Sequence, residues 1–434
     1  MSPREPIENR EGFRASLALL RRNRDFRRLY GASLISLGGD WFLLVALFGL
    51  TLDITSSPIA VALLIAAQEI PFFLMSPIGG HLADRLDRKR IMVTCDLVRA
   101  VLCLGFLLVH DAGTLWIAFL LLAAISSFSA VFDPASSAAF PNFVDPRDLG
   151  PANALFGSLW GTMLAVGAAL GGVVSAAIGR DAAFVIDAVS FAFSGYLIWR
   201  IRAPFAEARE AHEEQPRLVE ATVETARFAR RDHRVLALLG VKAGFGLAAG
   251  VLVLISVFAV DVFHRGEIGI GILMAARGLG ALIGPFLGRR LAGPEDRYLF
   301  TAIAAALGMF GLGYVLLGLM PSLVLAALAV MLAHLGGGAQ WTLSSYGLQR
   351  LVPDRIRGRI FSFDNALITL TLTISSLVTG WTAARFGPRP TAVGLGIVAV
   401  AYAGIWAWTT TDVRRATMMD GCGAAPELAE PDPA

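Results

Sequence analysis

The sequence has few charged residues and few of the side chains that build disulfides or metal sites. Only 16% of its 434 residues are charged, whereas soluble proteins average about a quarter. Of the three cysteines, Cys95 and Cys103 lie two turns apart in one apolar segment, and Cys422 stands apart from both. Two helical turns span roughly 12 Å, which is too far for a disulfide. We therefore expect neither a cysteine framework nor a metal site.

The residues needed for ATP use or covalent catalysis are also missing. Lysine occurs only at Lys89 and Lys242, so no Gly-x4-Gly-Lys-Ser/Thr loop exists. The six histidines are scattered, without a His-Glu-x2-His pair, and no Gly-x-Ser-x-Gly turn is present. The formal net charge of +3 does not indicate nucleic-acid binding. The sequence predicts no enzyme, no cofactor and no nucleic-acid partner.

Apolar sequence, in contrast, is abundant. Hydrophobic residues make up 56% of the chain, and the mean hydropathy is +0.64. Because a membrane-spanning helix needs about 20 apolar residues, the long apolar runs predict an all-α polytopic membrane protein with twelve transmembrane helices. The expected spans are 30–52, 59–80, 91–109, 114–135, 153–178, 182–200, 235–260, 268–288, 298–319, 322–346, 360–384 and 391–410.

Charge placement and internal repetition predict the topology. Arginine is concentrated in the expected tails, the central linker and every second loop, so the positive-inside rule places both termini in the cytoplasm. Gly80-x3-Asp84-Arg85 is echoed in the second half by Gly284-x3-Gly288-Arg289, which indicates two repeats in parallel orientation. The expected domains are a cytoplasmic N-terminal tail 1–28, a six-helix bundle 29–200, a cytoplasmic linker 201–234, a second six-helix bundle 235–410 and a disordered cytoplasmic tail 411–434.

The loop after the second span carries a distinctive motif. It reads Gly79-Gly80-His81-Leu82-Ala83-Asp84-Arg85-Leu86-Asp87-Arg88-Lys89-Arg90, which resembles the loop signature of the major facilitator superfamily. A glycine lets two helix ends approach, an aspartate can face the positive end of a helix, and arginines can pair with acids or lipid headgroups. We expect Gly80, Asp84, Arg85, Arg88, Lys89 and Arg90 to form a cytoplasmic gate.

Shorter motifs in other spans resemble the enterobactin-exporter and macrolide-efflux branch of that superfamily. They include Gly39-Asp40-Trp41, Asp96-Leu97-Val98-Arg99-Ala100 and Val352-Pro353-Asp354-Arg355-Ile356-Arg357-Gly358-Arg359. The resemblance implies a monomeric transporter in a bacterial inner membrane, surrounded by lipid, that exports an amphiphilic small molecule in exchange for protons by alternating access. The sequence departs from the family pattern at two points. Ala168 replaces the proline of the antiporter motif in span five, which bears on the direction of transport, and span four has no arginine, which bears on the coupling to protons. A lipid flippase, an importer and a non-transporting scaffold or sensor stay open as alternatives.

Two acidic residues in the expected spans are candidates for proton coupling. A charge at the bilayer centre costs on the order of 2.5 to 3.5 kcal/mol and requires a cavity, a partner or a proton. Asp40 and Glu69 both fall near the middle of their spans. We expect the two carboxylates to lie near each other and to exchange protons, the alternative being a permanent ion pair or a structural protonated acid.

The other intramembrane polar residues have candidate binding or structural roles. Lys242 and Arg277 are expected to bind an anionic substrate, or to pair with Asp40 or Glu69 and be released when protons bind, the alternative being a fixed ion pair that holds the two halves together. Trp341 and Asn365 are further candidates for substrate contact on polar or aromatic helix faces, with packing as the alternative for Trp341.

Four more intramembrane charges are expected to have structural roles. We expect Asp96 and Arg99, spaced i, i+3, to form an ion pair with each other or to contact the gate loop. Asp187 is expected to act as a cap or latch near the outer end of span six, with substrate contact as the alternative, and Asp364 to face the dipole of span eleven.

Overall fold

The computed structural model describes residues 13–145, 148–205, 227–228 and 231–420. Every regular element in these ranges is helical. Twelve of the described helices are long and apolar enough to cross a membrane. The all-α polytopic fold expected from the apolar runs is confirmed.

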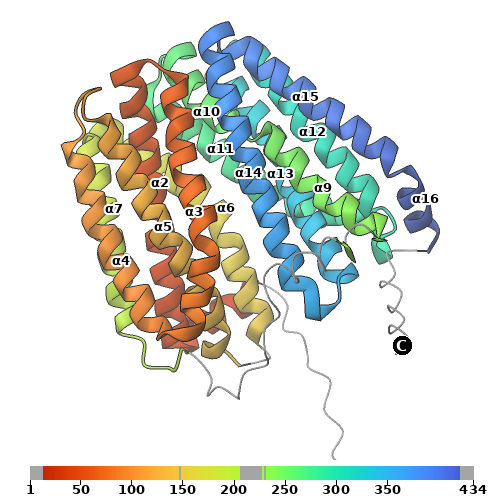
Figure 1. Ribbon diagram of the computed structural model, residues 1–434, viewed down its shortest axis with the longest axis horizontal. Helices are drawn as coiled ribbons and strands as arrows, with labels where there is room; N and C mark the ends of the chain where they lie inside the picture. The colour runs from red at the N-terminus through yellow and green to blue at the C-terminus, as the bar shows by residue number, and fades with distance from the viewer. Residues whose placement is uncertain (1–12, 146–147, 206–226, 229–230, 421–434) are drawn as a thin grey trace, which may run out of the picture. The chain divides into compact units, whose positions relative to one another are not determined.

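The helices divide between two compact units (Figure 1). Unit 1 comprises residues 1–212, 252–278 and 380–388, and unit 2 comprises 213–251, 279–379 and 389–434. Unit 1 therefore includes segments from both halves of the chain. The expected domain boundaries instead assign each half of the chain to its own bundle.

Close glycine contacts explain why residues 252–278 belong to unit 1. A Cβ atom on Gly271 would come within 2.8 Å of the Ala168 carbonyl oxygen, and one on Gly278 within 2.4 Å of the Ala165 nitrogen. The absence of these side chains lets two helix backbones approach closely. The crowding of glycine that the sequence shows in these spans thus marks a real helix contact.

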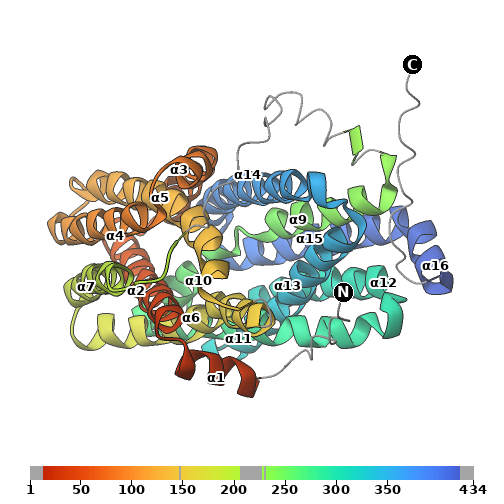
Figure 2. The same cartoon turned by 90° about the horizontal axis from the view of Figure 1, so that it is seen from below.

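Unit 1 contains six spans from the first half of the chain, preceded by a short helix. In Figure 2, α3, α5 and α4 form one layer, and α7, α2 and α6 form a second layer beside it. The bounds are α1 Phe13–Arg22, α2 Arg24–Thr55, α3 Pro58–Arg85, α4 Arg88–Gly105, α5 Leu115–Ala139, α6 Leu149–Ala177 and α7 Arg180–Trp199. They are followed in this unit by most of α10 Val251–Val257, a π-helical turn Phe258–Val262 and the first part of α11 Gly266–Ala292.

Local side chains set where several helices begin. The Asn23 side chain accepts a hydrogen bond from the Phe26 amide (2.9 Å), and the Asp87 side chain accepts one from the Arg90 amide (2.9 Å). Both side chains cap backbone amides of the first helical turn, which have no hydrogen-bond partner inside the helix. Gly179, with φ +108°, makes the turn between α6 and α7 in a backbone conformation that L side chains rarely adopt.

Unit 2 is built around α13, which packs against α12 and α9. Its helices are α9 His233–Ala248, α12 Leu299–Leu319, α13 Leu323–Leu351, most of α14 Asp354–Phe386, α15 Pro388–Thr409 and α16 Thr411–Asp420, together with the end of α11. The tail expected to be disordered from residue 411 thus begins with a helix. Val413 of α16 packs against the buried apolar core of unit 2, which anchors this helix.

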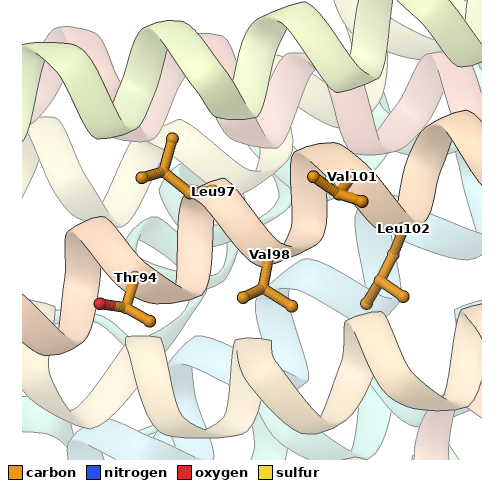
Figure 3. A pocket seen from close by; sticks show the side chains of 5 residues that line it. All are labelled: Thr94, Leu97, Val98, Val101 and Leu102. Atoms are coloured by element: carbon orange, nitrogen blue, oxygen red, sulfur yellow. The ribbon is translucent and has the colours of Figure 1, made fainter.

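The outer surface of the spans is apolar. On α4, Leu97 is 50% exposed and Val101 is 69% exposed, whereas Asp96 and Arg99 on the same helix are buried. A shallow groove on this face is lined by Thr94, Leu97, Val98, Val101 and Leu102 (Figure 3). An exposed apolar face over a buried charged one suits a helix that contacts lipid.

Candidate functional site

A cluster of charged residues lies within unit 1, where Asp96, Arg99 and Asp187 are buried, Asp40 is partly exposed and Asp133 is exposed. It contains four carboxylates and one guanidinium, and we call it the acidic cluster: Asp40 on α2, Asp96 and Arg99 on α4, Asp133 on α5, and Asp187 on α7. Arg99 pairs with Asp96. Because the carboxylates exceed the cations by three, this region cannot be neutral without protons.

Arg99 is held from several sides. Its guanidinium lies between the Phe132 and Phe191 rings, 4.6 and 4.3 Å from their centroids, and it donates a hydrogen bond to the Ser129 hydroxyl (3.1 Å). Asp96 accepts a second hydrogen bond from the Ser194 hydroxyl (2.7 Å). Stacking on two rings favours a fixed guanidinium.

Asp187 belongs to this cluster, so the expectation of a cap or latch near the outer end of span six was wrong. Its side chain is fully buried and accepts hydrogen bonds from the Cys103 thiol (3.1 Å) and the Ser190 hydroxyl (3.2 Å). A Cβ atom on Gly39 would come within 2.4 Å of Asp187 Oδ1. The bare backbone of Gly39 therefore lets Asp187 approach the turn of α2 that carries Asp40.

Asp40 and Glu69 have different charged neighbours. Among the described residues, Asp40 interacts electrostatically with Arg99, Asp133, Asp96 and Asp187. Glu69 on α3 interacts instead with Arg277, whose guanidinium lies 5.4 Å from the centroid of the Trp160 ring. The structure therefore gives Asp40 an acidic partner that the sequence did not select, Asp187, and it places a cation beside Glu69.

Lys242 on α9 has its partners inside unit 2. Its ammonium lies 3.3 Å from Asp364 Oδ2, 3.3 Å from the Ser345 hydroxyl, and 3.5 Å from the centroid of the Trp341 ring. The sequence left pairing with Asp40 or Glu69 open and assigned Asp364 to a helix dipole. The structure instead pairs the two residues. Asn365, the neighbour of Asp364 on α14, is exposed.

The seventh span is interrupted after the part of α9 that carries Lys242. Helix α9 ends at Ala248 and α10 starts at Val251. The Ser375 hydroxyl of α14 donates to the Leu247 carbonyl (2.6 Å) and accepts from the Gly250 amide (3.0 Å). One side chain thus satisfies backbone groups on both sides of the break, which a membrane interior requires.

Two basic residues of the gate motif, Arg88 and Lys89, bind backbone carbonyls at or near helix ends. Arg88 donates to the carbonyl oxygens of Ala83, Ala138 and Phe205, and Lys89 donates to that of Ile201 (2.8 Å). Cations at the C-terminal ends of α3 and α5 match the helix dipole, and the same side chains bind carbonyls of the segment that follows α7.

The close helix approach in this motif occurs at Gly79. A Cβ atom there would come within 2.2 Å of the Ala130 carbonyl oxygen, whereas one on Gly80 would meet open space. Arg85 is exposed, the Arg90 amide binds Asp87, and the Asp84 side chain lies outside the described part of the chain.

Sequence reasoning missed two further charge networks. In unit 1, Arg180 at the start of α7 pairs with Asp53 and Glu267. In unit 2, Asp296, a buried residue between α11 and α12, pairs with Arg289 and Arg350. Only Arg289 had a sequence signal, as part of the repeated loop motif.

Asp296 lies outside the spans and is held in its ionised form. Burial raises the pKa of this carboxyl, but hydrogen bonds from Tyr346 (2.7 Å), Arg289 and Arg350 outweigh burial and hold the pKa below its usual value. The network therefore stays ionised at neutral pH.

Taken together, twelve apolar helices and buried, unevenly charged clusters on them are features of a membrane transporter. The family model of the Major Facilitator Superfamily matches residues 29–367. The chain belongs to the major facilitator superfamily.

Curated relatives include efflux proteins. The chain is 28% identical to the putative bacilysin exporter BacE of Bacillus subtilis over 362 residues, covering 80% of this chain and 86% of the relative. It is 23% identical to macrolide efflux protein A of Streptococcus pyogenes, covering 83% and 90%. A match to the uncharacterised transporter YfiS of Bacillus subtilis, at 27% identity, covers about half of each protein, 49% of this chain and 51% of the relative.

Solved structures share the fold at low sequence identity. A bacterial homologue of the lysosomal transporter Spinster superposes with a TM-score of 0.67 at 15% identity, covering 92% of this chain and 99% of that one. A bacterial homologue of the iron transporter ferroportin superposes with a TM-score of 0.65 at 18% identity, covering 88% and 98%. The resemblance to efflux members of the superfamily is confirmed, and the chain is a transporter in family and fold.

Proposed function

We propose that this chain exports an amphiphilic small molecule across a bacterial inner membrane in exchange for protons, by alternating access of two helical bundles. The observation that carries the proposal is the acidic cluster, in which four carboxylates accompany one guanidinium. Uncompensated carboxylates inside a membrane protein are stable only with bound protons or with access to water. The export direction is supported by the efflux relatives, BacE and macrolide efflux protein A.

Within the cluster, Asp40 and Asp187 are assigned the proton-carrying role. Arg99 is engaged by Asp96, whereas Asp40 and Asp187 repel each other electrostatically. Asp187 is fully buried and Asp40 is partly exposed, so a proton can enter at Asp40 and be shared with Asp187. Like-charged neighbours that cannot both ionise cheaply form a proton-sharing pair. Asp96 and Arg99 then hold the geometry of the cluster.

Glu69 and Arg277 form the second proposed coupling element. Loss of a proton from Glu69 creates a carboxylate beside a cation, and gain of a proton releases that cation. Each proton exchange therefore changes the net charge of the Glu69–Arg277 pair, whose guanidinium lies over the Trp160 ring. The basic residues of the gate motif, in this proposal, keep the cytoplasmic helix ends of the first bundle together.

The test uses purified protein in liposomes with an imposed pH difference and an entrapped pH-sensitive dye. A macrolide, a short peptide antibiotic, a fluorescent amphiphilic dye and a labelled lysolipid are offered in turn. Movement of a non-lipid probe against its gradient, coupled to proton flux, is the expected result. Movement of lysolipid alone makes the protein a flippase, uptake instead of extrusion makes it an importer, and inert liposomes with every probe make it a scaffold.

Single substitutions assign the residues. Asp40→Asn, Asp187→Asn and Glu69→Gln are each expected to abolish pH-driven movement while leaving the protein folded. Asp111→Asn, the same change at an exposed turn, is the matched control and is expected to transport as the unaltered chain does. A variant that keeps full pH-driven transport removes its residue from the coupling mechanism.

A further inference from the structure

The partners of Lys242 leave its ammonium with no spare hydrogen-bonding direction. An ammonium has three N–H donors. Here one direction is taken by Asp364 Oδ2 and one by the Ser345 hydroxyl, each at 3.3 Å, and the Trp341 ring face lies at 3.5 Å. We call the three groups that surround the ammonium, Asp364, Ser345 and Trp341, the carboxylate–indole site.

Asp364, in contrast, has an acceptor left over. Its side chain is buried, and its Oδ1 atom has no hydrogen-bond partner in the described structure. A buried carboxylate oxygen without a donor costs free energy, so such atoms are rare in folded proteins. The distance from Lys242 to Oδ2 is also longer than the 2.7–2.9 Å typical of a strong charge-assisted hydrogen bond. The site therefore has a free hydrogen-bond acceptor, Asp364 Oδ1, and lacks a hydrogen-bond donor to pair with it.

The ion pair itself is buried, but the indole beside it is exposed and the site is lined by aromatic groups. Trp341 is 38% exposed, and Asn365, beside Asp364 in the chain, is exposed. The Phe245 ring packs edge-on against Trp341 at 5.5 Å and stacks on Phe310 at 4.8 Å. An indole face beside a carboxylate is a favourable environment for an organic cation, which gains from both groups at once.

We propose that the carboxylate–indole site binds a protonated amine of the transported molecule, which displaces the Lys242 ammonium from Asp364 and Trp341. This inference rests on the proposed transport function and names the substrate class. The exchange keeps one ammonium beside Asp364, and the displaced Lys242 ammonium stays in the protein as one added positive charge. Lys242 has a flexible four-carbon stem on which its ammonium can swing away. A neutral molecule cannot make the exchange without leaving Asp364 as an unpaired buried charge, so the site selects monocationic amines.

Binding to purified protein in lipid nanodiscs, without any pH gradient, tests the proposal. Three probes share one scaffold and differ in charge: 2-phenylethylamine, 3-phenylpropionate and 2-phenylethanol. The expected order is amine above alcohol and acid. Asp364→Asn is expected to weaken amine binding by about tenfold or more, and Lys242→Gln to strengthen it by a similar factor because the competing ammonium is gone. Asp364→Glu keeps the carboxylate and should retain binding within a few-fold.

Opposite responses of the two variants separate this proposal from its competitors. If Lys242→Gln abolishes binding of the acid and Asp364→Asn improves it, the site binds anions and the proposal is overturned. If no probe binds the unaltered chain, or both variants lose amine binding together while staying folded, the pair is only structural. Trp341→Leu leaves the ion pair intact, so it serves if Lys242→Gln does not fold, and it should weaken amine binding several-fold without affecting the alcohol.

Failure of the site and failure of the transport function give different results. Glu295→Gln, an exposed carboxylate of unit 2, removes the same charge elsewhere and is expected to bind all three probes as the unaltered chain does. Amine binding in nanodiscs with inert liposomes would support the site and defeat the transport proposal. Transport of a non-amine in liposomes, with no amine binding in nanodiscs, would defeat the site and leave transport standing.

Discussion

Gly39 packs directly against Asp187: a Cβ atom on the glycine would lie 2.4 Å from a carboxylate oxygen of the aspartate and 2.1 Å from the Ser190 hydroxyl. Both partners on α7 are buried. The contact therefore depends on the absence of a side chain on α2, one residue before Asp40. The small size of Gly39 therefore helps to set the position of Asp187 in the acidic cluster.

Gly39→Ala is accordingly expected to destabilise unit 1. Overpacking a tight contact costs about 1–3 kcal/mol, and the displaced Asp187 would lose its hydrogen bonds to Ser190 and Cys103. Thermal unfolding in nanodiscs measures the loss. Gly31→Ala on the same helix is the control, because its Cβ would meet only Leu197 at 3.8 Å. Equal melting temperatures for the two variants would contradict this account.

Two adjacent serines on α14 are expected to respond in opposite ways. Ser375→Ala removes both hydrogen bonds that hold the break at Gly250, which should cost about 1–3 kcal/mol because buried backbone groups lose their partner. Ser376→Ala should be neutral or stabilising, since its buried hydroxyl has no hydrogen-bond partner in the described structure. Unfolding midpoints of the two variants provide the comparison. A larger loss for Ser376→Ala would refute the assigned role of Ser375.

The Arg180 network predicts a salt-dependent contribution from charge pairing. Arg180→Gln removes the shared partner of Asp53 and Glu267 and should lower stability by about 1 kcal/mol, because Asp53 is half exposed and its pairing is screened. The difference from the unaltered chain should shrink as ionic strength rises. Arg200→Gln, at the other end of α7, is the control. A difference that persists at high salt would indicate lost packing instead.

Asp296 predicts a loss of stability in acid. Its pKa is lower in the folded protein than in the unfolded chain, so the stabilisation is complete above the usual aspartate pKa and is lost as pH falls through the folded pKa. Asp296→Asn should be less stable than the unaltered chain at pH 7, and the two should converge in strong acid. Unfolding midpoints from neutral pH down into strong acid, below the usual aspartate pKa, test this. Parallel curves would show that the carboxylate contributes nothing through its charge.

The sequence predicts helices well here because each span carries its own signal. Apolar length alone indicated the twelve spans, and i, i+3 spacing indicated the contact of Asp96 with Arg99. It could not predict that Lys242 finds Asp364, because the two residues are on helices far apart in the chain, and many pairings satisfy the same charge count. Nor does composition distinguish Gly79 from Gly80, since only the position of Ala130 on a neighbouring helix decides which glycine is needed.

The scarcity of lysine makes the pair in unit 2 chemically addressable. Lys89 is tied to the Ile201 carbonyl, and Lys242 is covered by Asp364 and Trp341. An acylating reagent that attacks unprotonated side-chain amines therefore has only two lysine targets in the whole polypeptide. Peptide mass spectrometry of the acylated protein would then detect directly whether Lys242 has moved away from Asp364, without any engineered probe.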